Sequence, residues 1–130
     1  MLHLLMRKAL RSLSRWTAFS WLFFLAGCGG GPSGPTSVST VAITATGVTP
    51  TEVRVTAGGS VTFINNDARP HAISSDPVQV HTDCPPVNNV SFLNPGQSGS
   101  TGALTVRGTC GFHDHLNESD PIFKGRILVE

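Results

Sequence analysis

Charged side chains are scarce in this chain of 130 residues, and the sequence motifs of nucleotide-binding and hydrolytic enzymes are absent. Only 13% of the residues are charged, whereas 39% are hydrophobic, a balance that favours one compact domain and argues against a disordered or nucleic-acid-binding protein. No serine stands in a Gly-x-Ser-x-Gly elbow, and no glycine-rich phosphate loop precedes a helical pattern. We therefore do not expect an enzyme.

The longest apolar run of the sequence is too short to anchor the chain in a membrane. It covers 16–26 and follows a stretch, 1–15, that holds four basic residues and no acid. Residues 25–28 read Leu-Ala-Gly-Cys and resemble the lipobox of bacterial lipoproteins, in which the cysteine becomes the lipidated N-terminus. The resemblance implies a signal peptide at 1–27, lipidation of Cys28, and a place in the bacterial cell envelope, at the outer membrane or facing the periplasm.

The residues after the signal peptide divide into a linker and a domain. We expect 28–37, the lipidated cysteine with a Gly/Pro/Ser-rich stretch, to be flexible and to leave a folded domain at 38–130. The mature part has five basic and eight acidic residues, a net charge of −3, so we expect no nucleic-acid partner. The protein is predicted to be a monomer held at the membrane by its lipid.

Helical periodicity is missing from the domain. Short alternations of apolar and polar residues occur instead, as at Val53 and Val55 or at Val61 and Phe63, and turn residues separate them about every ten positions. This pattern predicts an all-β fold, a Greek-key β-sandwich of about seven or eight strands. The expected strands are 41–43, 53–55, 61–64, 72–74, 90–93, 104–107 and 125–129.

Cysteine is also scarce, because only Cys84 and Cys110 remain in the mature chain besides Cys28. The mature chain has four histidines, and we expect these and the two cysteines to lie in connections between strands, where sandwiches place their binding sites. His81 is interpreted as an ordinary solvated or hydrogen-bonded loop residue. The four histidines are His71, His81, His113 and His115.

Several segments of the domain resemble the cupredoxin family, the small blue copper proteins such as plastocyanin, amicyanin and azurin. VTFINNDARPHAI (61–73) is similar to the family's strand, Asn-rich turn and first copper histidine, and FLNPGQS (92–98) is similar to its Pro-Gly turn. TCGFH (109–113) resembles its Cys-x-x-His, and FKGRILV (123–129) resembles its last strand. The similarity covers about 38–130 and implies a cupredoxin-like fold.

The resemblance also implies a copper site. By position, the ligands would be His71, Cys110 and His113, with His115 competing for the last place. A thiolate and two imidazoles suit both oxidation states of copper, so the implied function is that of a single-electron carrier with a redox protein as its partner.

The family's axial methionine is absent from this chain, since both methionines fall in the predicted signal peptide. Leu116 and Glu118 stand at the two spacings that the family uses for this ligand. A leucine would favour Cu(I), and a carboxylate would favour Cu(II).

Cys84 has no role in a copper site of this kind. In a small exported domain two cysteines favour a disulfide, and Cys84 with Cys110 is the one intrachain pair in the folded part. The bond would stabilise the fold by about 3–4 kcal/mol and would remove the thiolate. The protein would then be a copper-free or histidine-only binding or storage module, in which histidines bind copper together with Asp114 or Glu118. The sequence leaves both alternatives open.

Overall fold

The computed structural model describes residues 38–130, in which nine strands and three short 3₁₀-helices follow one another. Residues 1–37, with the predicted signal peptide, Cys28 and the linker, lie outside the described residues. Within 38–130 no helix is long and apolar enough to cross a membrane. The strands are β1 (Val38–Thr44), β2 (Gly47–Thr49), β3 (Glu52–Val55), β4 (Ser60–Asn65), β5 (His71–Ser75), β6 (Ser91–Leu93), β7 (Ser98–Ser100), β8 (Gly108–Asp114) and β9 (Lys124–Val129). The 3₁₀-helices are η1 (Pro85–Asn89), η2 (His115–Asn117) and η3 (Pro121–Phe123).

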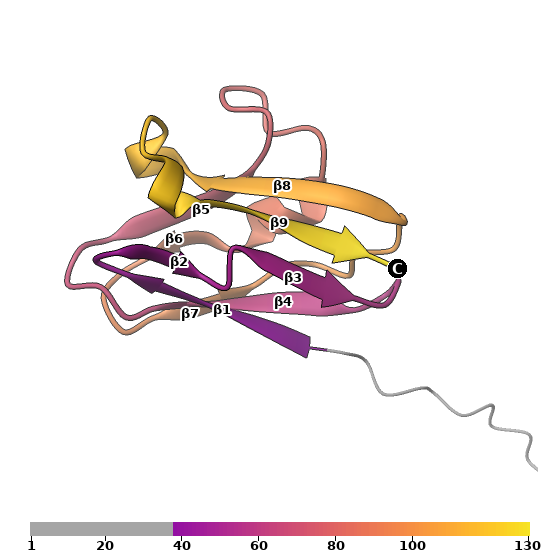
Figure 1. Ribbon diagram of the computed structural model, residues 1–130, viewed down its shortest axis with the longest axis horizontal. Helices are drawn as coiled ribbons and strands as arrows, with labels where there is room; N and C mark the ends of the chain where they lie inside the picture. Colours follow the sequence, from indigo (N-terminus) through magenta and orange to yellow (C-terminus); the bar gives the residue numbers. More distant parts are fainter. Residues whose placement is uncertain (1–37) are drawn as a thin grey trace, which may run out of the picture. The chain divides into compact units, whose positions relative to one another are not determined.

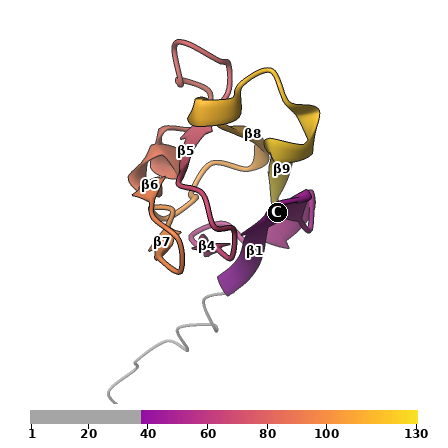
Figure 2. The same ribbon diagram turned by 90° about the vertical axis from the view of Figure 1, so that its left-hand side faces the viewer.

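The strands form two sheets that pack face to face (Figure 1). One sheet has the order β2-β1-β4-β7, and the other has the order β3-β9-β8-β5-β6. The pairs β1 with β4 and β3 with β9 are parallel, whereas the other neighbours are antiparallel. Figure 2 shows the two layers from one end, with β5 and β8 in one layer and β1 and β4 in the other. The predicted all-β sandwich is confirmed.

Alternating side chains fill the space between the sheets. In β4, Val61, Phe63 and Asn65 are buried, and the residues between them are partly exposed. Phe63 meets Phe112 of β8 edge to face, with ring centroids 4.9 Å apart. Such a pair contributes about 0.5–1.5 kcal/mol beyond the burial of its area. This contact holds β8, and the polar residues that follow Phe112, in a fixed position over the other sheet.

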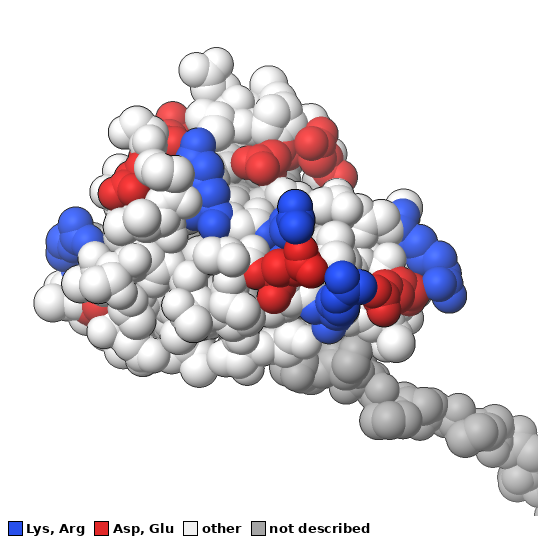
Figure 3. Space-filling model, in the orientation of Figure 1, with Lys and Arg blue, Asp and Glu red and all other residues white. Residues whose placement is uncertain are grey.

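Ion pairs on the outer surface join β3 to β9. Glu52 accepts hydrogen bonds from Arg126 at 2.7 Å and from Arg54 at 3.2 Å, and Arg54 also pairs with Glu130. Figure 3 shows these charges of both signs side by side on one face of the molecule. The bonds from Arg126 and Arg54 lower the pKa of Glu52, but exposed ion pairs of this kind contribute little to stability.

One predicted strand near the candidate ligands is wrong, whereas 72–74, 90–93 and 125–129 correspond to β5, β6 and β9. The segment 104–107 forms only one isolated bridge, at Leu104, and β8 begins after it. Cys110 and His113 therefore lie within a strand, and His71 is the first residue of another. The sequence did not predict β8 because its later residues are buried on both faces and carry polar side chains, so the usual alternation of apolar and polar residues is absent.

Two short edge strands were also not predicted. β2 begins with a glycine at φ +116° and reads as a turn, and β7 has the polar sequence Ser-Gly-Ser. Short polar strands are common at sheet edges, because they do not attract other chains. Both lie at the edges of the four-stranded sheet, whereas His71, Cys110 and His113 lie in the five-stranded sheet.

Candidate metal centre

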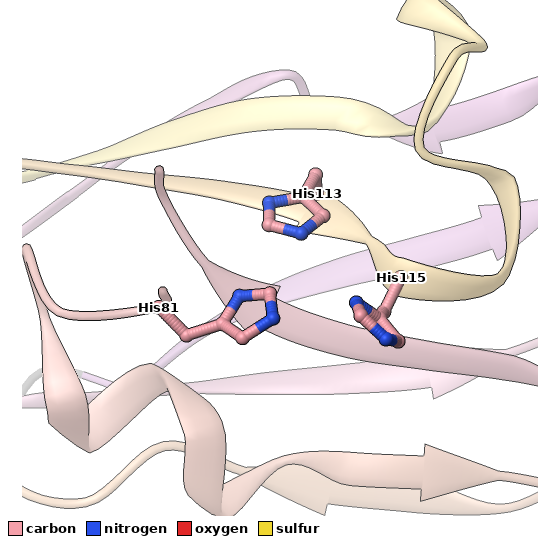
Figure 4. A group of neighbouring side chains, drawn as sticks. All are labelled: His81, His113 and His115. Atoms are coloured by element: carbon pink, nitrogen blue, oxygen red, sulfur yellow. The ribbon is translucent and has the colours of Figure 1, made fainter. Parts of the chain in front are cut away.

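Three histidines from separate parts of the chain converge beside β8 (Figure 4). His113 lies in β8, His115 opens η2, and His81 comes from the connection between β5 and η1. One ring nitrogen of each lies within 4.8 Å of those of the other two. The rings of His81 and His113 stack with centroids 5.1 Å apart, and His115 meets His81 edge to face at 4.9 Å. We call these three residues the histidine triad.

Two hydrogen-bonded turns bring the triad together. After β8, the Asp114 carboxylate accepts a hydrogen bond from the Leu116 N–H at 3.2 Å, which caps η2 and places His115 next to His113. In the other segment, the Asp83 N–H donates to the Asp76 carbonyl at 2.9 Å and closes residues 76–83 into a loop. We call 76–83 the His81 loop.

Each imidazole of the triad has its Nδ1 atom within hydrogen-bonding distance of a protein oxygen. A donor bond from Nδ1–H fixes the tautomer and leaves Nε2 as the nitrogen with a free lone pair. Metal-binding histidines usually have this support, in which a carbonyl or carboxylate holds the nitrogen that does not face the metal. The pairs are His81 Nδ1 with Ser75 O (3.0 Å), His113 Nδ1 with Asp76 Oδ1 (2.8 Å) and His115 Nδ1 with Glu118 Oε1 (2.8 Å).

The Nε2 atom of His113 is buried and forms no hydrogen bond within residues 38–130. Its side chain is 0% exposed, whereas that of His115 is 47% exposed, so the triad extends from the interior to the surface. A buried polar atom without a partner costs about 1–3 kcal/mol. A metal ion between the three rings would use this lone pair, and the donor set of the triad therefore fits a metal ion.

His71 lies outside the triad, and both of its ring nitrogens contact carboxylates. It is fully buried, with Nδ1 2.8 Å from Asp114 Oδ2 and Nε2 3.1 Å from Asp67 Oδ2. The other oxygen of Asp114 accepts the Ala72 N–H at 2.8 Å. His71 thus has no free nitrogen for a metal. It belongs to a buried polar network that joins the start of β5 to the end of β8.

The carboxylates of this network have lowered pKa values. Burial alone would raise the pKa of Asp114, but the hydrogen bonds it accepts, led by that of the Ala72 N–H, lower it below the ordinary 3.8. Burial would likewise raise the pKa of Asp67, and the hydrogen bonds from His71 and Arg69 lower it. Both groups are therefore ionised at neutral pH, and the network around His71 is a charged one.

The prediction that Cys110 is a thiolate ligand needs correction. In the structure its sulfur is bonded to that of Cys84, with the two Cα atoms 5.4 Å apart. The strand register gives a second reason, because Ile73 pairs with Asp114 and Cys110 lies further along β8. By this register Cys110 and His71 are about six residues, or roughly 20 Å, apart along the strands. They cannot be ligands of one ion.

Of the four predicted metal ligands, the structure brings two together. His113 and His115 lie in the triad, whereas His71 and Cys110 have the structural roles just described. The disulfide that the sequence offered as the alternative is the one that the structure contains. The predicted ligand set and the histidine triad therefore share two residues, His113 and His115.

His81 is the residue that sequence reasoning missed. It lies three positions before Cys84, and the disulfide brings that part of the chain to β8. The signal that could have identified His81 is its position three residues before Cys84, a predicted disulfide partner of Cys110. Neither residue considered for the axial place belongs to the triad, since Leu116 is 50% exposed and Glu118 holds His115.

We expect His71→Ala to lower the free energy of unfolding by about 3–5 kcal/mol, because it leaves the buried carboxylates of Asp67 and Asp114 without the imidazole that contacts both. Urea unfolding followed by circular dichroism measures the change. Asn66→Ala, at an exposed position of the preceding turn, is the control and should be close to the wild type. A stability of His71→Ala equal to that of the wild type would contradict the structural role.

The pH dependence of the stability of Asp67→Asn should reveal the charge of the network around His71. Because the folded protein holds the pKa of Asp67 below 3.8, the carboxylate stabilises the fold above that pH and loses its effect as the pH falls through the lower, folded value. The variant should be less stable than the wild type at pH 7, and the gap should narrow in acid. Unfolding free energies across this range test the sign, and a gap that widens in acid would refute it.

No protein-family model and no curated protein matches this sequence, but solved structures do. A purple cupredoxin from Nitrosopumilus maritimus is 20% identical with a TM-score of 0.56, over 71% of this chain and 99% of that one. A plastocyanin from Dryopteris crassirhizoma is 21% identical with a TM-score of 0.55, over 71% and 100%. A methionine-to-alanine mutant of amicyanin in the Cu(I) state is 24% identical with a TM-score of 0.52, over 72% and 82%. These similarities show that residues 38–130 have the cupredoxin fold.

Proposed function

We propose that this protein binds one copper ion through the histidine triad and serves as a histidine-only binding or storage module. The observation that carries the proposal is the buried, unpartnered Nε2 of His113 next to two further imidazoles. Each ring is already held through its other nitrogen, so the donors are oriented before an ion arrives. A solved amicyanin mutant with the same fold is in the Cu(I) state, and we propose copper here at a different set of ligands.

The chemistry of the donors favours the divalent ion. Imidazoles suit copper and zinc, and among first-row divalent ions Cu²⁺ binds such ligands most tightly. The carboxylates of Asp76 and Glu118, behind His113 and His115, add two negative charges close to the rings. These charges would balance those of a dication. When bound, the ion would supply a Lewis-acidic, positively charged centre, and the protein residues would hold and orient it.

We place the electron-carrier interpretation second, because its ligand set is incomplete here. A blue copper site uses a thiolate with two imidazoles, and the Cys110 sulfur is held in the disulfide. The histidine that the resemblance assigned as the first ligand contacts two carboxylates instead. A redox protein partner is therefore not part of the proposal.

The proposed module would act in the bacterial cell envelope as a lipid-anchored monomer. The basic and apolar segments at 1–27 and the lipobox at Cys28 support export and lipidation, with 28–37 as a spacer between lipid and domain. A disulfide fits an oxidising compartment of this kind.

Titration with Cu²⁺ tests the proposal directly. We expect one equivalent to bind, with an electron paramagnetic resonance spectrum of nitrogen ligands and without the intense visible absorption of a copper–thiolate bond. His113→Ala should weaken binding by more than the roughly 10–100-fold that the loss of an outer support costs. His81→Ala and His115→Ala should weaken it as well.

Asp83→Ala is the matched control for these variants, because it changes an exposed acid in the same loop. It should bind copper like the wild type. A protein that binds no copper, or whose affinity is unchanged in His113→Ala, would refute the proposed function. A strong blue colour that is lost in Cys110→Ser would instead restore the electron-carrier interpretation.

Asp76 should set the affinity without touching the ion. Asp76→Asn keeps an oxygen for His113 Nδ1 but removes the charge, and Asp76→Ala removes both. We expect copper affinity to fall in the order wild type, Asn, Ala, with a total loss of about 10–100-fold. Asp83→Asn is the control for charge alone. Calorimetric titration gives the affinities, and equal values for all four proteins would exclude this role.

A further inference from the structure

The disulfide joins the two segments that carry the buried part of the triad. Cys84 lies three residues after His81, and Cys110 lies three residues before His113. The covalent bond therefore ties the His81 loop to β8, which is the strand that His81 must reach. Its place in the structure gives the disulfide a second role besides stabilising the fold.

The His81 loop has a backbone conformation that needs support. Gln79 and His81 have φ values of +83° and +53°, in the left-handed region that residues with a Cβ rarely occupy. At its start, the loop is held by the Asp76 N–H, which donates to the Gly111 carbonyl at 3.0 Å. Near its end, the Asn88 amide donates to the His81 carbonyl at 2.9 Å, and the disulfide follows. Opening the disulfide would remove the covalent attachment to β8.

A small pocket lies beside this bond, whose two cysteines are each 6% exposed. It has a volume of about 170 Å³, and both Cys84 and Cys110 line it together with Pro85, Pro86 and the segment 104–109. This size is similar to that of cavities of roughly 150 Å³ that admit benzene. Val106, which also lines the pocket, is 80% exposed.

The pocket is lined by one charged residue of each sign. Arg107 is among the lining residues, is exposed, and forms no ion pair with another of the residues in 38–130. Asp83 lines the pocket too, so the two charges differ in sign. A cation next to a disulfide stabilises an incoming thiolate, which is the species that attacks it.

We propose that this pocket admits a thiol reductant to the Cys84–Cys110 disulfide, and that reduction releases the metal by freeing the His81 loop. The inference rests on the proposed function, because it concerns the metal of the histidine triad. In the step, a thiolate of the reductant attacks one sulfur, forms a mixed disulfide and displaces the other sulfur as a thiolate. A second thiolate of the reductant then attacks the reductant's own sulfur in the mixed disulfide and displaces the protein sulfur as a thiolate, so two electrons pass to the protein and the reductant leaves as a disulfide.

The first experiment compares Zn²⁺ affinities, because zinc does not change its oxidation state. The oxidised protein should bind one ion. Cys84→Ser/Cys110→Ser, which mimics the reduced form without adding thiols as ligands, should bind about 10–100-fold more weakly. If the oxidised protein binds no zinc and no copper, the proposed function is wrong. If both folded proteins bind zinc equally, only the inference about the disulfide is wrong.

Small exported domains often depend on their disulfides, so the double variant can fail to fold, and amide NMR spectra would reveal this. The second experiment covers that case. The wild type is equilibrated in a glutathione redox buffer with and without Zn²⁺, and the reduced fraction is measured after alkylation. Linkage is reciprocal, so zinc should shift this equilibrium toward the disulfide by the same 10–100-fold factor. His81→Ala should show no shift, which controls for zinc bound by glutathione. An equal shift in both proteins, or none in either, would overturn the inference.

The third experiment tests the entrance. Arg107→Glu should slow reduction by glutathione a few-fold, and it should slow reduction by 2-mercaptoethanol less, because that thiol carries fewer negative charges. Arg126→Glu, on β9 and outside the pocket, is the control and should react like the wild type. Equal rates for all three proteins with glutathione would show that thiols do not enter through this pocket.

Discussion

The pairing of β5 with β8 is the constraint on which the site depends. Its register places Ser74 opposite His113 and Ile73 opposite Asp114. Consecutive residues of a strand point to opposite faces of the sheet. Asp114 therefore turns inward to His71, while His113 turns outward to the His81 loop. A shift of this register by one residue would exchange the two environments and would destroy both the buried network and the triad.

Two sets of polar residues thus lie on opposite faces of one strand. They differ in whether every histidine nitrogen has a hydrogen-bonding partner. In the inner network, both nitrogens of His71 have carboxylate partners within about 3 Å, as buried polar groups normally do. In the outer triad, His113 is equally buried and still has an unused lone pair. In this cupredoxin fold, the carboxylate of Asp114 lies beside His71. The donors suited to a metal lie on the other face of the same sheet.

The fold was largely predictable from the sequence, because its apolar alternation is plain in segments such as Val53 to Val55 and Val61 to Phe63. β8 was not predictable in this way, since His113 and Asp114 are buried without being apolar. His113 and His115 were expected at a metal site, and the structure brings them together. His81 depends on a loop that is positioned by a distant disulfide, and no local pattern encodes such a contact. The composition suggested a disulfide between Cys84 and Cys110. It did not decide between this disulfide and a free Cys110 thiol.

The buried network around His71 has a consequence for protein engineering. Replacing Asp114 by cysteine would bring a thiol next to His71. It would also remove the carboxylate that accepts hydrogen bonds from the Ala72 N–H and from the Asn117 amide. Asp67 would still occupy the second nitrogen of that imidazole. Installing a blue copper centre in this scaffold would therefore require several coordinated replacements, since each polar group there satisfies another.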